Sequence, residues 1–164
     1  MSENPDIAAQ KTAVRAAMLA QLRAMTPEDR AARSDIICRR IIESQPWQGA
    51  ERVLLFSPIR TEPDIAPVGA LATDAGKRIS IMPTTLRTES QLQLPFVPDL
   101  VLVPGLAFSR GGHRLGRGGG FYDRLLSGRA RNAIKLGSCF ASQLLDTIPT
   151  EEHDALLDAV ISDE

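Results

Sequence analysis

Two different patterns of hydrophobic residues divide this chain near residue 50. In the first part, apolar residues recur every three or four positions, which predicts two amphipathic helices, over 5–25 and 27–43. A threonine, a proline and two acidic residues in succession at 26–29 are typical of a helix start. Residues 46–49 predict a loop after the second helix. The residues expected on the buried helix faces are Val14, Met18, Leu22, Met25, Ile37 and Ile41.

After residue 50 the apolar residues come in short runs. Two of these runs, at 53–56 and 100–103, contain no polar residue, which is typical of strands buried on both faces in a parallel sheet. A crossover helix is predicted over 64–75, with Asp64 as its cap and Gly76 at its end. The predicted strands cover residues 53–56, 79–82, 100–103, 133–136 and 159–162.

The segments between these strands complete the predicted fold. Residues 84–98 are polar and bounded by prolines, so we expect a surface connection there, and residues 151–157 are expected to form a helix or turn. Another helix is expected to begin near Gly120 or Phe121. Together the elements predict an α/β fold with a single domain over residues 1–164: an open, mostly parallel sheet flanked by helices on both faces and preceded by two N-terminal helices.

The composition narrows the class of protein. With 43% hydrophobic and 24% charged residues, the chain is similar to globular proteins and unlike collagen-like, disordered or disulfide-rich ones. No apolar run reaches the roughly 18 residues needed to span a bilayer, and no secretory signal is visible, so we expect a cytoplasmic protein. A net charge of −1 argues against a protein that coats nucleic acid. Cys38 and Cys139 are expected to be small buried hydrophobes.

Glycine is concentrated in one window. Eight of the 12 glycines lie within residues 105–128, directly after the predicted strand at 100–103. Ligands of open parallel sheets bind at the carboxyl ends of strands, and glycine lets backbone N–H groups approach phosphate oxygens. A helix that starts in this window would direct further N–H groups to the same place. The window therefore predicts an anion-binding loop, with a flexible loop that binds nothing as the alternative.

Charge is unevenly distributed around this loop. Residues 104–130 hold five arginines and one acid, Asp123, whereas residues 146–164 hold seven acids and no lysine or arginine. An anionic ligand accompanied by a cation would explain both, and mutual salt bridges or solvated faces are the alternative. Asp123 can be an acid favoured at the start of a helix, or a magnesium ligand beside a phosphate.

Three residues outside the loop are also candidates for ligand contact. Lys11 and Arg15 lie one helical turn apart, and a phosphate between them would relieve the repulsion of like charges, although solvated cations are common on helices. Glu62 follows the first predicted strand, where it could bind an amine-bearing ring or sit in a turn.

Several familiar motifs do not fit. The glycines have no lysine in the Walker A position, and Phe121 stands where the dinucleotide fingerprint requires its last glycine. Ser109 and His113 lack the surroundings of a nucleophile elbow. The histidines and cysteines do not have zinc-site spacing. Spacing alone therefore leaves the identity of the anion open.

One run, PDLVLVPGLAFSRGGHRLGRGGGFYDRLL over residues 98–126, resembles the signature of the 5-formyltetrahydrofolate cyclo-ligase family, also called 5,10-methenyltetrahydrofolate synthetases. The resemblance extends to Lys11 and Arg15, to Glu62 with the proline and aspartate after it, and to the tail SQLLDTIPTEEHDALLDAVIS over residues 142–162. Nearly the whole chain is covered, so the resemblance implies the fold of that family as well as its chemistry.

The activity implied by the resemblance is that of a ligase. Such an enzyme uses Mg²⁺ and ATP to convert 5-formyltetrahydrofolate to 5,10-methenyltetrahydrofolate, ADP and phosphate. The formyl oxygen attacks the γ-phosphoryl group, N10 then closes the ring and phosphate leaves. Phosphoryl transfer of this kind depends on positioning and charge neutralisation. The expected partners are these small molecules, and the lack of a long exposed apolar helix favours a monomer.

The same resemblance implies roles for individual residues. Asp123 and Asp154 would hold magnesium, and Arg117 and Tyr122 are expected to touch the transferring group as catalytic residues. The residues implied to contact folate are Phe56, Glu62, Arg117, Gly118, Gly119, Gly120 and Phe121. The residues implied to hold ATP are Lys11, Arg15, Arg114, Leu115, Gly116, Arg117, Gly118, Gly119, Gly120, Phe121 and Tyr122.

Two features depart from the family pattern. The connection over 84–98 is shorter than usual and lacks a recognisable Glu-Pro element, which would leave part of a folate pocket missing. Gly119 stands where some relatives carry lysine. The alternatives to a ligase are a non-catalytic relative that binds folate or nucleotide, and a sugar-phosphate or acyl-transfer enzyme on a related scaffold.

Overall fold

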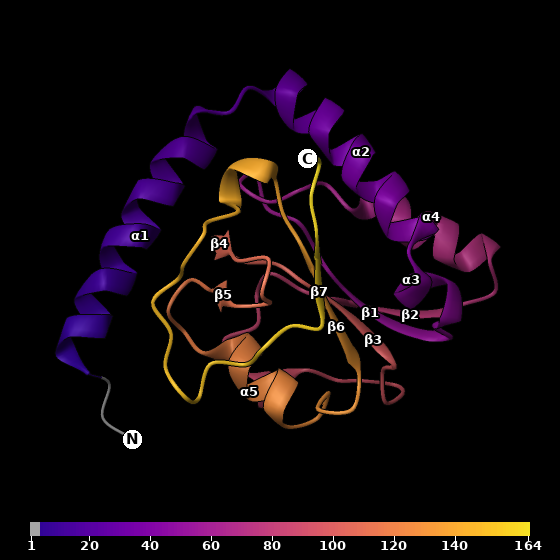
Figure 1. The fold of residues 1–164 in the computed structure, drawn as a ribbon. Helices are drawn as coiled ribbons and strands as arrows, with labels where there is room; N and C mark the ends of the chain where they lie inside the picture. The colour runs from indigo at the N-terminus through magenta and orange to yellow at the C-terminus, as the bar shows by residue number, and fades with distance from the viewer. Residues whose placement is uncertain (1–3) are drawn as a thin grey trace.

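A five-stranded parallel sheet forms the centre of the protein (Figure 1). The computed structural model describes residues 4–164, and its sheet has the strand order β2-β1-β3-β6-β7. Every neighbouring pair in this sheet runs parallel, which confirms the predicted sheet type. The strands are β1 (Arg52–Phe56), β2 (Arg78–Met82), β3 (Leu100–Val103), β6 (Ile134–Ser138) and β7 (Ala159–Ile161).

The two apolar runs without polar residues form two neighbouring inner strands of the sheet. All four residues of β3 are buried, as are the last four of β1. Because side chains alternate between the faces of a strand, Val53 and Leu55 pack into one core cluster, whereas Leu54 packs into a second one across the sheet. The sheet therefore has an apolar core on each face, as the absence of polar alternation predicts.

Helices cover both faces, as expected. The first core cluster receives side chains from α1 (Pro5–Ala24), α2 (Pro27–Glu43), α3 (Gln45–Gly49) and α4 (Ala66–Asp74). The second receives Leu125 and Leu126 from α5 (Phe121–Ser127), which lies on the side of the molecule opposite the arch of α1 and α2 (Figure 1). In residues 4–164 no helix combines the length and apolarity needed to cross a membrane.

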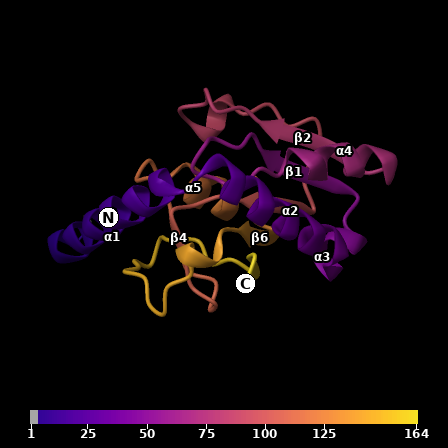
Figure 2. The ribbon, with the colours of Figure 1, turned by 90° about the horizontal axis from the view of Figure 1, so that it is seen from above.

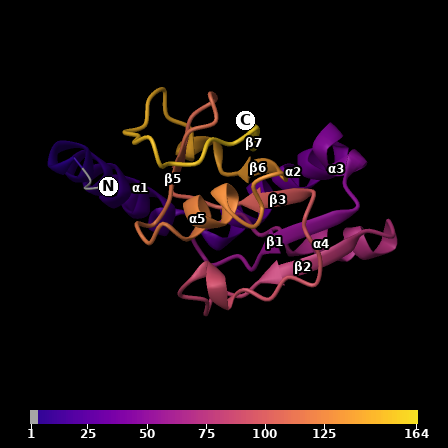
Figure 3. The same ribbon diagram turned by 90° about the horizontal axis from the view of Figure 1, so that it is seen from below.

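The first helix extends past the end of the sheet. Seen from above and from below, α1 projects beyond the strands and runs beside a small hairpin (Figure 2 and Figure 3). Met18 and Leu22 are buried and Val14 and Met25 are partly buried, so the predicted apolar face is confirmed. This placement leaves the N-terminal half of α1 next to the loops that follow the strands.

The starts of the N-terminal helices follow from local side-chain bonds. The Thr26 hydroxyl accepts a hydrogen bond from the Asp29 amide at 3.1 Å, which confirms the predicted cap of α2. The prediction of a loop over 46–49 is wrong, because these residues belong to the short helix α3. The Ser44 hydroxyl caps this helix by accepting from the Trp47 amide, and the indole is buried against the core.

A hairpin interrupts the segment that was expected to be one long loop. Strands β4 (Ala107–Phe108) and β5 (Arg114–Leu115) pair in antiparallel fashion, so that expectation is wrong in this part. The Ser109 hydroxyl accepts from the His113 amide at 3.1 Å and closes the turn between them. Strands of two residues are too short to leave a recognisable alternation of apolar and polar positions.

Other boundaries differ by one or two residues. The strand predicted at 133–136 runs from Ile134 to Ser138, and the crossover helix runs from Ala66 to Asp74. The prediction of Asp64 as its cap is wrong, because Ile65 takes the N-cap position, although the Asp64 side chain accepts a hydrogen bond from the Ala66 amide at 3.1 Å. Within 151–157 only residues 152–154 form a turn, and the connection over 84–98 is irregular apart from the single 3₁₀ turn η1 (Glu89–Gln91). A second such turn, η2 (Ala141–Gln143), follows β6.

Candidate active site

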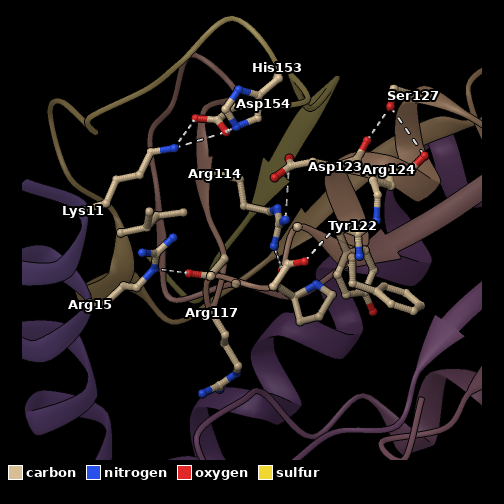
Figure 4. A pocket seen from close by; sticks show the side chains of 18 of the residues that line it. Lys11, Arg15, Arg114, Arg117, Tyr122, Asp123, Arg124, Ser127, His153 and Asp154 are labelled. Atoms are coloured by element: carbon tan, nitrogen blue, oxygen red, sulfur yellow. Dashed lines mark hydrogen bonds and ion pairs between the residues drawn. The ribbon is translucent and has the colours of Figure 1, made fainter. Parts of the chain in front are cut away.

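Two adjoining cavities open at the carboxyl edge of the sheet. The loops that leave β1, β2 and β3 line both of them, as expected for a ligand site of an open parallel sheet. The larger cavity has a volume of about 670 Å³ and is shown in Figure 4, and the smaller has about 230 Å³. Six residues line both cavities: Glu62, Leu86, Pro104, Arg117, Phe121 and Tyr122.

The structure brings the sequence-predicted residues together around these cavities. All eleven residues implied to hold ATP line the larger cavity, together with Asp123 and Asp154. Glu62 borders both cavities, and Phe56 borders only the smaller one. The two sets of implied contacts therefore overlap: Gly118, Gly119 and Gly120 border only the larger cavity, whereas Arg117, Phe121 and Tyr122 lie at the boundary between the two spaces.

The cations of α1 each have a partner from a distant segment. Arg15 donates from Nε to the carbonyl oxygen of Gly116 at 2.9 Å. Lys11 is buried, and its Nζ lies 2.9 Å from Asp154 Oδ2 (Figure 4). The same Nζ lies 3.6 Å from Glu151 Oε2. The helix is thus fastened to both the basic loop and the acidic tail, so salt bridging accounts for part of the uneven charge distribution.

The glycine loop proper lies between β5 and α5. Gly118 and Gly120 have φ values of 107° and 69°, a region that residues with a Cβ rarely adopt. A Cβ on Gly119 would meet nothing within 4 Å, so the loop has room for the lysine that some relatives carry there. Since α5 has only seven residues, anion binding at this place would depend on the loop and its arginines.

Arg114 lies beneath this loop. Its Nη1 donates to the carbonyl oxygen of Pro104 at 2.9 Å, and its guanidinium lies 5.2 Å from the centre of the Tyr122 ring. Its Nη2 is 3.8 Å from Asp123 Oδ1. Within the described residues, the buried Nε has no hydrogen-bond partner. Arg114 therefore holds the turn after β3, the aromatic ring and the carboxylate in one cluster.

The two aspartates that are candidates for magnesium are held close to each other. The amide of Ala155, the residue after Asp154, donates to Asp123 Oδ1 at 3.0 Å. Residues 4–164 contain no cluster of three or more His, Cys, Asp or Glu side chains suited to a metal. Magnesium, however, is commonly bound by one or two carboxylates together with water and substrate phosphates. Asp123 and Asp154 fit this mode of binding, in which the protein supplies only two of the magnesium ligands.

Glu62 and Arg117 meet where the cavities join. Arg117 donates from Nη2 to the Thr61 hydroxyl at 2.9 Å and lies 3.8 Å from Glu62 Oε2. Burial raises the pKa of Glu62, although the hydrogen bond from Ile59 and the nearby arginines oppose this. Burial also raises the pKa of Tyr122, so its hydroxyl keeps its proton and is available as a hydrogen-bond donor.

Several residues around the cavities were not predicted. Leu86 and Arg87 come from the 84–98 connection, and His153 precedes one of the predicted metal ligands. Arg30 of α2 donates to the carbonyl oxygens of Glu62 and Ile59 at 2.9 and 3.2 Å, and so fixes the turn that carries the Glu62 carboxylate. No local pattern distinguishes Arg30 from the other arginines of its helix, whereas His153 lies in the His-Asp pair of the family-like tail.

The fold and site define a class of protein. It is an open parallel α/β protein with a basic glycine loop, a pair of carboxylates and two joined cavities at the carboxyl edge of its sheet. The sequence matches the model of the 5-formyltetrahydrofolate cyclo-ligase family over residues 7–98 and 88–163. The chain belongs to this family, which is named for a ligase that forms a carbon–nitrogen bond.

Individual relatives agree with this assignment. A 5-formyltetrahydrofolate cyclo-ligase from Mycolicibacterium smegmatis is 47% identical over 64 residues, which are 39% of this chain and 33% of that protein. The mouse protein of the same name is 24% identical over 191 residues, covering 94% of each chain. That alignment is longer than this chain, so the mouse protein contains insertions relative to it. The solved structure of a 5,10-methenyltetrahydrofolate synthetase from Mycoplasma pneumoniae shares the fold, with a TM-score of 0.78, 22% identity, and coverage of 94% of this chain and 99% of that one.

Proposed function

We propose that this protein converts 5-formyltetrahydrofolate to 5,10-methenyltetrahydrofolate with consumption of ATP. The observation that carries the proposal is the shared wall of the two cavities. Arg117, Tyr122 and Glu62 border both spaces, so a nucleotide in the larger cavity and a folate in the smaller one would meet at these side chains. A reaction that transfers a phosphoryl group between two substrates requires this arrangement.

ATP is assigned to the larger cavity. Phosphate groups there would lie among Lys11, Arg15, Arg117 and the backbone N–H groups of residues 116–120, which together supply positive charge and hydrogen-bond donors. Arg114 would support the glycine loop from beneath, because its guanidinium is buried and already donates to a carbonyl oxygen. The remaining members of the proposed ATP site are Leu115, Phe121 and Tyr122.

The folate is assigned to the smaller cavity. Its wall is largely apolar, with Phe56 on one side and Phe121 at the boundary. The Glu62 carboxyl provides a buried acceptor for an amine-bearing ring, held in place by the Ile59 amide at 3.0 Å. The cavity includes Pro83, Thr84 and Leu86, so the short connection does contribute a wall to it.

The chemistry at the boundary proceeds in two steps. The formyl oxygen attacks the γ-phosphorus of ATP; the new oxygen–phosphorus bond forms as the bond to the bridging oxygen breaks, and ADP leaves. N10 then attacks the formyl carbon, loses its proton, and phosphate departs with the former formyl oxygen. Arg117 would neutralise charge on the transferring phosphoryl group, and the protonated Tyr122 hydroxyl would donate a hydrogen bond to it.

Asp123 and Asp154 would hold a magnesium ion. A bound magnesium ion neutralises phosphate charge and orients the phosphoryl group. Within the protein, Asp123 is oriented by the Ala155 amide, and Asp154 is oriented by the Glu151 amide at 2.8 Å. The Lys11 ammonium beside Asp154 adds a further positive charge on the phosphate side.

The direct test is formation of the methenyl chromophore from 5-formyltetrahydrofolate. We expect product with the purified protein, magnesium and ATP, and none when ATP is left out. Folate binding without product would identify a non-catalytic relative. Turnover of a sugar phosphate or acyl donor in the absence of folate turnover would favour the other enzyme class.

A further inference from the structure

Arg124 connects two segments that are distant in sequence. It lies on α5, and its Nη1 donates to the carbonyl oxygen of Gly119 in the glycine loop at 2.9 Å. Its Nε donates to Glu89 Oε2 on η1, also at 2.9 Å. One guanidinium therefore holds the glycine loop and the 84–98 connection at the same time.

The adjacent glycine makes this contact possible. A Cβ on Gly120 would lie 2.7 Å from Arg124 Nη1, and the φ of Gly120 is 69°. A side chain at residue 120 would thus displace the guanidinium from the Gly119 carbonyl. At Gly119, by contrast, a Cβ would meet nothing within 4 Å. The backbone around the contact is shaped to admit the arginine.

A second arginine secures the other end of the link. Arg129 donates from Nη1 to the carbonyl oxygens of Glu89 and Leu92, at 3.1 and 2.5 Å. The hydrogen bond from Arg124 lowers the pKa of Glu89, as expected for a carboxylate whose charged form accepts from a guanidinium. The 3₁₀ turn is thereby held to α5 through both its side chain and its backbone.

We propose that Arg124 is a positioning residue that sets the conformation of the glycine loop for ATP, with Glu89 as the anchor that orients its guanidinium. This inference rests on the proposed function. Leu86 and Arg87, which precede the anchor by a few residues, line the larger cavity, and Leu86 also lines the smaller one. The link therefore joins the proposed folate wall to the proposed phosphate loop.

The shape of the arginine side chain distinguishes a positioning role from simple attraction of phosphate by a positive charge. An arginine fork bonds two partners in fixed directions, whereas a lysine ammonium at the same place is a single point charge on a flexible stem. If Arg124 acted by attracting phosphate, Arg124→Lys would retain its effect. If it acts by holding Gly119 and Glu89 together, the lysine variant loses most of that effect.

The experiment compares Arg124→Gln, Arg124→Lys and Glu89→Ala with the wild-type protein. Arg131→Gln serves as the control, because Arg131 is an exposed arginine of the segment that follows α5 and lines neither cavity. Binding of Mg–ATP is measured by calorimetry without folate, and KM for each substrate and kcat are measured in the chromophore assay.

We expect Arg124→Gln to weaken Mg–ATP binding and to raise KM for ATP by about ten-fold, since small displacements of binding groups have large effects. Arg124→Lys should remain at least about five-fold impaired, and Glu89→Ala should show a smaller loss in the same direction. The control should match the wild type. A variant that only loses folded protein would lower the apparent kcat and leave KM unchanged.

Recovery to within about two-fold of the wild type in Arg124→Lys would overturn the positioning role. Wild-type affinity in Arg124→Gln would overturn it as well. If the wild type binds Mg–ATP but forms no product, the proposed function fails while the binding measurements still decide the role of Arg124. If the wild type binds no Mg–ATP, both proposals fail.

Discussion

The two ends of the site are built differently. At the phosphate end, Lys11 and Arg15 each contact a segment more than 100 positions away, and Arg114 is buried against Pro104, so their positions are fixed by the folded protein. At the folate end, one wall of the smaller cavity comes from an irregular connection, and the main polar group is the buried Glu62. The cations of the phosphate end are thus preorganised, whereas recognition of the folate depends on a few side chains near the boundary between the cavities.

The largest expected effect is at the phosphate end. Asp123→Asn keeps an oxygen that can accept from the Ala155 amide, but it removes the charge proposed for magnesium and the partner of Arg114. We expect kcat to fall by about 100-fold or more. Glu152→Gln is the control, because Glu152 is exposed and lines neither cavity. Normal turnover in Asp123→Asn would contradict the proposal that Asp123 holds magnesium.

The second largest effect on turnover is expected at the boundary between the two cavities. Arg117→Gln should lower kcat by about 10- to 100-fold, because loss of one donor to a developing charge has an effect of this size. Its side chain is 39% exposed, so the fold should tolerate the change. Stopped-flow measurement of product formation with both substrates saturating checks this. A rise in KM for ATP with unchanged kcat would mean that Arg117 only binds the nucleotide.

A smaller effect is expected at the folate end. Glu62→Gln keeps the acceptor for the Ile59 amide and removes the charge offered to the folate ring. KM for 5-formyltetrahydrofolate should rise by about ten-fold, with KM for ATP changed by less than about two-fold. Steady-state titration of each substrate distinguishes the two. Equal increases in both constants would show that the two ends do not act separately.

The smallest effect concerns stability. Because burial raises the pKa of Glu62, the folded state disfavours its ionisation, and the wild type loses stability as pH rises from below 4.5 through the folded pKa. Glutamine does not ionise, so Glu62→Gln should melt at the same temperature as the wild type or about 2–4 °C higher at pH 7. This difference should disappear at about pH 4. A clearly lower melting temperature of the variant at pH 7 would show that the Arg117 contact outweighs the cost of burial.

The sequence is informative where a property is local. The polar-free runs predict β1 and β3, and the Thr26 cap predicts the start of α2, because these features depend on neighbouring residues. The glycine loop could be placed at the carboxyl edge because it directly follows a buried strand. The family-like motifs then identify residues that the structure gathers around one pair of cavities.

The features that could not be predicted depend on contacts across the fold. The hairpin of β4 and β5 has strands of two residues, which are too short for a pattern. The bonds from Arg30 to the Glu62 turn and from Arg124 to Glu89 span more than 30 positions, and an arginine that makes them looks like any solvated arginine in sequence. The shortness of the 84–98 connection is visible in sequence, whereas its attachment to α5 is not.

The meeting of the two cavities is tested most directly by measuring ADP release with and without 5-formyltetrahydrofolate. If the substrates react at the Arg117 and Tyr122 boundary, ADP should form only when the folate is present, with one methenyl product for each ADP. ADP release at the same rate without folate, or folate binding with no ADP at all, would contradict a shared reaction site.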